Sequence, residues 1–272
     1  MILDGHIHIN STHSKVDEML KRMEKAGIDG GLLISAMPDN MDEHAADYKE
    51  RIDHVIDCSK GHPYLFPFFF INPICEDAIE QIDYAIEKGI TGFKVICNKF
   101  YPSDPRCLEA IDYIAKKKKP VLFHSGILWD GKNSSGKYNK PVEFECMLSI
   151  EEIKFSLAHV SWPWCDENLA VFGKFLNAKK NNISSEMFID ITPGTPEIYR
   201  YDVLYKIFNI SYDVENNIIF GLDNCMEDYN VEWAQKWINI DNEIYHKSGI
   251  SKEVIDKLYS KNLLRFIHME EV

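Results

Sequence analysis

Eight short apolar runs recur along the chain, and their repetition constrains the fold more than any other feature of the sequence. They stand at intervals of roughly thirty residues, and most of them end near Gly, Pro or a polar residue. The runs read ILDGHIHI, GGLLISA, LFPFFFIN, ITGFKVIC, PVLFHSG, KFSLAHV, EMFIDI and NIIFGLD. Near-continuous apolar runs of this length are typical of strands in a parallel sheet that is buried on both faces.

Most of the stretches between the runs have the spacing of amphipathic helices. The first has one apolar face, formed by Val16, Met19, Leu20 and Met23. We expect Ser14 to cap the amino end of this helix and Gly27 to end it. The same spacing recurs before Gly89 and before Pro120. A helix is therefore expected after each strand.

Strands that alternate with helices over 272 residues favour an α/β fold, and about eight such units fit a closed barrel better than an open sheet. We predict a single (β/α)8 TIM barrel over residues 1–272, with its active site at the C-terminal strand ends. The alternative is a doubly wound sheet. It would be persuasive with a glycine-rich phosphate-binding turn, but the sequence has no G-x-G-x-x-G motif and no P-loop.

Two long polar connections follow the second and fifth runs, at residues 35–47 and 125–143. In a barrel of this kind the loops that leave the C-terminal strand ends build the active site. Both segments are therefore candidate lids, although each can also be read as a plain surface loop.

Charge and cysteine content narrow the class of protein. The formal net charge of −13 would repel phosphate backbones and anionic membranes, so we expect neither nucleic acid nor membrane as a partner. Seven scattered cysteines without a C-x-x-C pair argue against a disulfide scaffold and against a thiolate zinc site. The first residues do not resemble a secretory signal, so we expect a cytoplasmic protein.

Six residues at the ends of expected strands carry the chemistry. His6 and His8 stand one residue apart in the first run, so a strand would turn both to the same face. If the barrel closes, four further side chains converge on the same mouth, namely Lys94, His124, His159 and Asp223. Imidazole and carboxylate ligands suit zinc or another first-row divalent ion, and an open position for water makes such a site catalytic.

Each of these residues also has an ordinary structural reading. A strand histidine such as His159 can be a satisfied core residue, and Asp223 could cap the following helix. Lys94 could extend its ammonium group to solvent or form a salt bridge. The joint placement of all six at strand ends favours a metal site.

In this order, the motifs resemble those of the amidohydrolase superfamily, specifically its amidohydrolase-related (amidohydrolase 2) branch. The matching segments are DGHIHI, GITGFKV, YPSDPRCLEAIDYIAKKKKPVLFHSG, LAHVSWPW, IIFGLDN and SKEVIDKLYSKNLLRFI, and together they span the whole chain. That family of metal-dependent barrels includes hydrolases and a group of decarboxylases.

The resemblance also implies a ligand set for one divalent metal, consisting of His6, His8, His124 and Asp223. It implies that Asp223 transfers protons, and that His159 either activates water or substrate or ligates a second metal. Lys94 stands where some branches have a carboxylated lysine that bridges two metals, so one or two ions per chain remain open. Many members have a histidine close after this lysine, whereas Ile96 and Cys97 stand here.

Candidate substrate contacts lie just beyond the strand ends. Lys99 and Arg106 could hold a substrate carboxylate, since Arg suits bidentate carboxylate binding. Trp162 and Trp164 could form an aromatic wall. Surface charges and buried packing explain these four residues equally well.

Three classes of function follow. The first is a metal-dependent hydrolase that uses a metal-activated water to cleave a small amide, lactone or cyclic imide. The second is a metal-dependent decarboxylase of an unsaturated or aromatic acid. The third is a barrel that only binds a ligand, and the complete ligand set argues against it because unused buried polar groups are costly. We expect a small-molecule substrate, and we leave open whether the chain forms a homo-oligomer.

Overall fold

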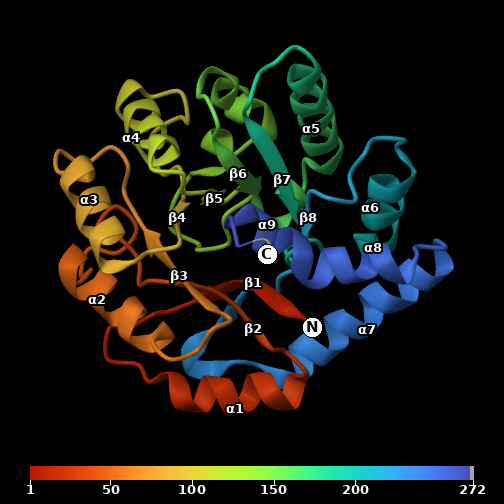
Figure 1. Cartoon of the computed structure of the whole chain (residues 1–272), viewed down its shortest axis with the longest axis horizontal. Coiled ribbons are helices and arrows are strands. Elements are labelled where there is room, and N and C mark those ends of the chain that lie inside the picture. Colours follow the sequence, from red (N-terminus) through yellow and green to blue (C-terminus); the bar gives the residue numbers. More distant parts are fainter. Residues whose placement is uncertain (270–272) are drawn as a thin grey trace.

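A computed structural model describes residues 1–269. In this part of the chain, nine parallel strands form one curled sheet with helices around its outside (Figure 1). Their order across the sheet is β8-β7-β6-β5-β4-β3-β2-β1-β9. The strands are β1 (Leu3–His8), β2 (Gly30–Ile34), β3 (Leu65–Phe70), β4 (Gly92–Val95), β5 (Val121–Phe123), β6 (Lys154–Leu157), β7 (Glu186–Asp190), β8 (Ile218–Ile219) and β9 (Asn224–Cys225).

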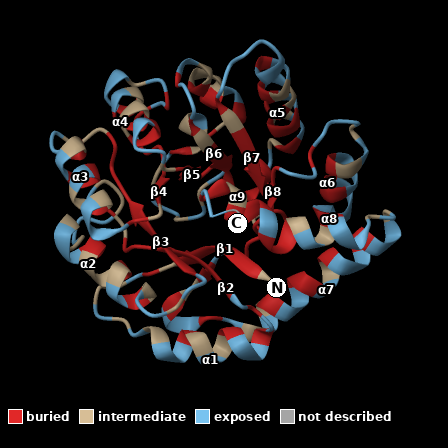
Figure 2. Ribbon diagram, in the orientation of Figure 1, coloured by how far each residue is buried: buried red, intermediate tan, exposed pale blue. Residues whose placement is uncertain are grey.

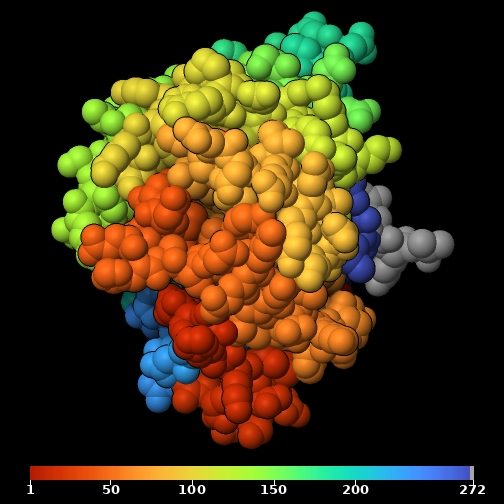
Figure 3. All heavy atoms as spheres, turned by 90° about the vertical axis from the view of Figure 1, so that its left-hand side faces the viewer, coloured from red at the N-terminus to blue at the C-terminus, as the bar shows by residue number. Residues whose placement is uncertain are grey.

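The α-helices mostly follow the strands along the chain, as expected. They are α1 (Val16–Ala26), α2 (Tyr48–Ser59), α3 (Ala78–Lys88), α4 (Pro105–Lys116), α5 (Cys165–Lys180), α6 (Glu197–Asn209), α7 (Val231–Lys247), α8 (Lys252–Asp256) and α9 (Asn262–Phe266). Figure 3 shows one flank of the molecule, where the orange side chains of α2 and α3 pack side by side.

The eighth apolar run contributes only the short strand β8, which pairs with β7. The two residues that follow the run form β9, which pairs with β1. Between them the backbone N–H of Gly5 in β1 donates to the carbonyl of Phe220 at 2.9 Å. The run therefore bonds to both β7 and β1, although the sheet does not show the eightfold repeat that the sequence predicted.

The expectation that a helix follows every strand is wrong for β5. Residues 124–153, all of which the structure describes, contain only the 3-10 helices η1 (Gly136–Tyr138) and η2 (Pro141–Ser149). Glycines in this segment adopt backbone angles that an α-helix excludes, with φ of 110° at Gly126 and 68° at Gly131. The buried side chain of Asn139 holds the loop together by donating to the carbonyls of Cys97 and Ser135.

Side chains of alternate strand residues divide into two apolar clusters. Leu33, Phe69 and Val95 belong to the cluster between the strands and the outer helices. The strand residues that alternate with them point to the inside of the curled sheet, where they pack with side chains of α9. We call this second group the interior cluster; it includes Leu32, Phe68, Leu122, Leu263 and Phe266. Figure 2 shows the buried strands in red and the exposed outer faces of the helices in blue.

The interior cluster occupies only one end of the curled sheet, so polar side chains can gather at the other end. Side chains of α9 belong to the same buried cluster as Leu3, at the amino end of β1, and α9 lies near the centre of the view in Figure 1. They fill the amino ends of the strands with apolar atoms. The carboxyl ends, where the H-x-H pair lies, remain for polar side chains.

The predicted ends of two helices are confirmed by left-handed glycines. Gly27 ends α1 with φ of 78°, and Gly89 ends α3 with φ of 98°. The prediction that Ser14 caps α1 is wrong. Lys15 is the capping residue and makes no side-chain cap, while the Ser14 hydroxyl donates to the Glu227 carboxylate at 2.6 Å.

All seven cysteines are free thiols. Within residues 1–269, no helix has both the length and the apolar character needed to cross a bilayer.

Candidate metal centre

The two histidines of the first run lie side by side at the carboxyl end of β1. Their Nε2 atoms are 3.1 Å apart, and the two ring centroids are 5.0 Å apart. His6 is fully buried, whereas the His8 side chain retains 17% of its exposure. The prediction that a strand would turn both rings to one face is confirmed.

Asp223 faces this pair from the break between β8 and β9, not from within a strand as the sequence suggested. Its Oδ1 atom lies 3.7 Å from His6 Nε2 and 3.5 Å from His8 Nε2. The backbone of Asp223 has a left-handed φ of 56° directly before β9, a conformation that non-glycine residues rarely adopt. The side chain is 38% exposed, so the site is open to solvent on this side.

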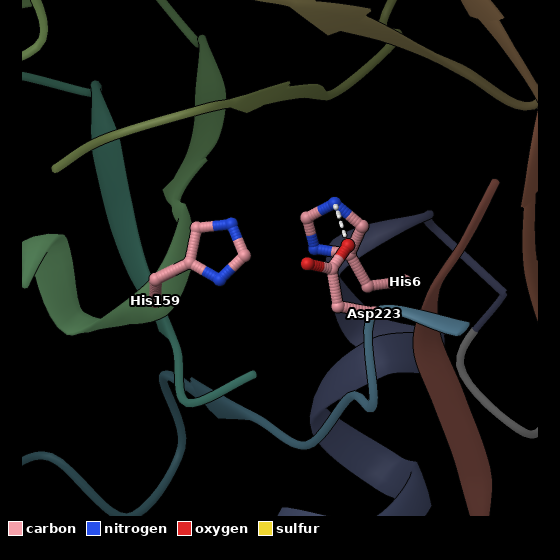
Figure 4. Close-up of side chains that lie close together, drawn as sticks. All are labelled: His6, His159 and Asp223. Carbon is pink, nitrogen blue, oxygen red and sulfur yellow. Dashed lines mark ion pairs between the residues drawn. The ribbon is translucent and has the colours of Figure 1, made fainter. Parts of the chain in front are cut away.

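His159 approaches from the opposite wall. It lies in the turn η3 (Ala158–Ser161) just after β6, and in Figure 4 its ring points toward His6 and Asp223. The rings of His159 and His6 stack with centroids 5.2 Å apart. His159, Val160 and Ser161 all have positive φ, a conformation that non-glycine residues rarely adopt. This turn aims the imidazole across the mouth.

Gly194, in the loop after β7, supports the placement of His159. A Cβ atom at this position would lie 2.9 Å from the His159 Cβ. Glycine is therefore needed here for a close approach.

His124 and Lys94 complete the cluster. The His124 ring lies 5.2 Å from the His159 ring, and its buried Nε2 atom has no hydrogen-bond partner among the described residues. The ammonium group of Lys94, fully buried on β4, donates to His6 Nε2 at 3.1 Å. The structure thus brings all six predicted strand-end residues together.

Asp190, at the end of β7, was not singled out from the sequence. Its Oδ2 atom accepts a hydrogen bond from His6 Nδ1 at 3.0 Å, and its Oδ1 atom accepts one from the Thr192 backbone N–H. With its proton on Nδ1, His6 presents the Nε2 lone pair to the site. The sequence feature that could have identified Asp190 is its position as an acidic residue near the end of the apolar run EMFIDI.

Asp4 is a second buried carboxylate that the sequence reading missed. It accepts hydrogen bonds from the backbone N–H groups of His6 and Leu222 and from the Tyr229 hydroxyl. These bonds tie β1 to the segment that carries Asp223. Burial, opposed by these donors, raises the pKa of Asp4 to about 7.

The surroundings keep the imidazoles of His6, His8 and His124 neutral. Burial, with the nearby Lys94 ammonium, holds the pKa of His6 and of His124 well below the usual value. Burial lowers the pKa of His8 to about 4 and that of Lys94 to about 8. Burial opposes ionisation of Asp223, but the neighbouring histidines and Lys94 outweigh it and lower its pKa. Neutral imidazoles beside a carboxylate are in the protonation states that bind a metal.

The donor geometry fits a tetrahedral ion. Ligand atoms about 2.0–2.1 Å from a tetrahedral zinc ion lie about 3.3–3.4 Å from one another. The three separations among His6 Nε2, His8 Nε2 and Asp223 Oδ1 are 3.1, 3.5 and 3.7 Å. Donor atoms of His6, His159 and Asp223 also lie within 4.8 Å of one another. Together with the unpartnered Nε2 atom of His124, these groups could hold a metal ion.

The candidate substrate-binding residues lie outside this cluster. Arg106 is exposed on α4, where its guanidinium binds Asp104, and Lys99 is exposed in the loop after β4. Trp162 packs against Tyr199. Within residues 1–269, none of these three candidate side chains hydrogen-bonds or ion-pairs with the histidines or Asp223.

Trp164, the fourth candidate, lines a cleft of about 720 Å³ with Trp162.

The sequence matches no family model and no curated protein. Three similar solved structures are an uncharacterised TIM-barrel protein from Bordetella bronchiseptica, a 2,6-dihydroxybenzoate decarboxylase and an amidohydrolase 2 from Bifidobacterium longum subsp. infantis. The first has a TM-score of 0.71 at 14% identity and covers 98% of each chain.

The decarboxylase has a TM-score of 0.65 at 15% identity and covers 99% of this chain and 98% of its own. The amidohydrolase 2 has a TM-score of 0.58 at 11% identity and covers 99% of each chain. The chain shares their barrel fold. The predicted barrel fold is thus one that this chain shares with solved structures that include an amidohydrolase 2.

Proposed function

We propose that this protein is a metal-dependent hydrolase that cleaves a small amide, lactone or cyclic imide. The observation that carries the proposal is the convergence of two imidazole nitrogens and one carboxylate oxygen at separations close to the edges of a zinc tetrahedron. The proposed ligands of one ion are His6, His8, His124 and Asp223. A zinc ion held there would supply Lewis acidity and lower the pKa of a water molecule to about 7.

The other steps belong to side chains of the chain itself. Asp223, held as a carboxylate by the surrounding cationic and imidazole groups, accepts the proton of the attacking water and returns it to the leaving group. His159 faces Asp223 across the mouth and stabilises the negative oxygen that develops on the substrate. Lys94 contacts His6 directly, so it could also take part in binding a second ion.

The substrate reaches the site from the carboxyl ends of the strands. His8 and Asp223 are partly exposed there, while His6 and Lys94 are buried. Met37 and Met41 of the β2–α2 loop and Leu128 of the β5–η1 loop are half-buried against the interior cluster. These apolar side chains support a small substrate with an apolar part.

A decarboxylase is the second candidate. The observation that favours it is the fold shared with 2,6-dihydroxybenzoate decarboxylase along nearly the whole of both chains. The same ligands and the same proton donor would serve a carbon–carbon cleavage. Release of carbon dioxide from a panel of unsaturated and aromatic acids would favour this candidate over hydrolysis.

Metal analysis of the purified chain tests the metal centre. We expect about one zinc ion per chain, or two if Lys94 takes part in a second site. The substitution His8→Ala should lower this content, whereas His62→Ala, a change in the turn before β3, should not. A chain that binds no divalent ion under any condition would refute the proposal.

Activity then distinguishes the roles. The variant Asp223→Asn should lose turnover by at least 10²-fold, since it cannot transfer the proton. Near-normal turnover by this variant with full metal content would contradict the role of Asp223.

A further inference from the structure

Large apolar side chains are unusually exposed beside the mouth of the barrel. Trp129 in the β5–η1 loop is 75% exposed, and Ile198 at the start of α6 is 82% exposed. We name this surface the aromatic patch; its exposed members are Ile127, Trp129, Ile198, Tyr199, Tyr201 and Tyr205. Contiguous exposed apolar surface of this kind marks interaction sites.

The two halves of the aromatic patch are joined by direct contacts. The backbone N–H of Ile127 donates to the carbonyl of Trp162 at 2.9 Å, and the Trp162 ring packs 4.8 Å from the Tyr199 ring. Along α6, the rings of Tyr201 and Tyr205 stack with centroids 6.0 Å apart. The patch therefore runs from the loop after β5, across the cleft at Trp162, to the exposed face of α6.

The net charges at its two ends are opposite in sign. The loop end carries three lysines, Lys132, Lys137 and Lys140, against the two acids Asp130 and Glu143. At the α6 end Glu197 pairs with Lys236 and Lys206 with Asp166, and the exposed Asp202 forms no ion pair within residues 1–269. A surface that is basic at one end and acidic at the other complements itself when a second copy is turned by 180°.

We propose that the aromatic patch is the interface of a two-fold homodimer of this chain. Trp and Tyr are enriched at the centres of protein interfaces, and charged pairs occupy their rims. With exposures of 42% to 82%, the six side chains of the patch offer on the order of 600 Å² of accessible surface. A standard interface buries about 800 Å² per partner, and the lysine and carboxylate rim supplies the remainder.

The dimer would lie next to the mouth without using the metal ligands. The patch begins at Ile127, three residues after His124, and it reaches α6, which follows the loop containing Gly194. This placement makes the inference independent of the proposed activity.

Sedimentation velocity of the full chain tests the proposal. We expect the wild-type protein to sediment with twice the 31.6 kDa mass of one chain. The variants Trp129→Asp and Ile198→Asp place a charge at the two most exposed positions of the patch, where neither residue supports the core. Each should weaken self-association at least tenfold and yield monomers.

The matched control is Ile183→Asp, which also places a charge at an exposed apolar position. Ile183 follows the carboxyl end of α5, about 24 Å along that helix from the end that borders the patch. It should remain dimeric, and circular dichroism should show that all three variants are folded. A monomeric wild type at about 100 µM, or dimers that persist in both patch variants, would overturn the proposal.

Discussion

Asp190 offers the sharpest test of how the site is organised, because it contacts a proposed ligand but no substrate. Both oxygens of its carboxylate act as acceptors, one toward His6 Nδ1 and the other toward the Thr192 backbone N–H. The variant Asp190→Asn has the same shape but only one acceptor. Either Thr192 loses its acceptor, or the amide N–H₂ group faces His6 and favours the tautomer with a proton on Nε2.

The size of the effect follows from the burial of this pair. His6 and Asp190 are both fully buried, so water cannot replace the lost bond. A hydrogen bond to a charged group contributes about 1.5–3 kcal/mol. Since 1.4 kcal/mol corresponds to a factor of ten, zinc affinity should fall roughly 10- to 100-fold.

The assay is a zinc titration in competition with a chromophoric chelator, which measures affinity without a substrate. The matched control is Glu186→Gln, an acid-to-amide change at the other end of β7, roughly 13 Å away. It should bind zinc as the wild type does. Wild-type zinc affinity in Asp190→Asn, with the same fold by circular dichroism, would refute the role assigned to Asp190.

Three further predictions concern pH and stability. Because burial lowers the pKa of His8 to about 4, zinc affinity should change little from neutral pH down to about 5 and fall steeply near 4. Zinc titrations at a series of pH values measure this, and a loss of affinity already near the ordinary imidazole pKa of about 6.5 would contradict the prediction. Arg200 and Asp241 form a fully buried ion pair, so Asp241→Leu alone should lower the free energy of unfolding by about 3–5 kcal/mol, and Arg200→Met in addition should restore much of it, as measured by urea denaturation. Burial opposes ionisation of Glu186, but Arg265 outweighs it and lowers the pKa of that carboxyl. The carboxylate therefore stabilises the fold above the unfolded pKa of about 4.3, and this stabilisation is lost as the pH falls. The free energy of unfolding of Glu186→Gln should therefore differ from that of the wild type at neutral pH but not in acid, and a difference that persisted in acid would exclude the charge as its cause.

Sequence patterns predicted those parts of the fold that depend on local spacing. The apolar runs located the strands, and Gly27 and Gly89 located helix ends, because a left-handed residue stops a helix wherever it stands. The pair His6 and His8 was predictable for a similar reason, since strand geometry alone turns alternate residues to one side.

Local spacing failed where the backbone leaves regular geometry. His159 and Asp223 were expected in strands, yet both have a left-handed backbone outside the strands, His159 just after β6 and Asp223 between β8 and β9. The expectation of a helix after each strand failed after β5, where the long polar connection has glycines with other backbone angles. Ser14 resembled a cap, although its hydroxyl bonds to Glu227, which is 213 residues away.

The sequence by itself determined which residue types stand at the strand ends, and therefore that histidine and carboxylate donors are available near one mouth. Only the tertiary structure decided how they meet. Asp190 and His6 are 184 residues apart, and Lys94 and His6 are 88 apart, so their contacts exist only when the sheet curls and its edges approach. No local pattern encodes such a contact, because it depends on strand register and curvature, which are set by packing of the whole interior.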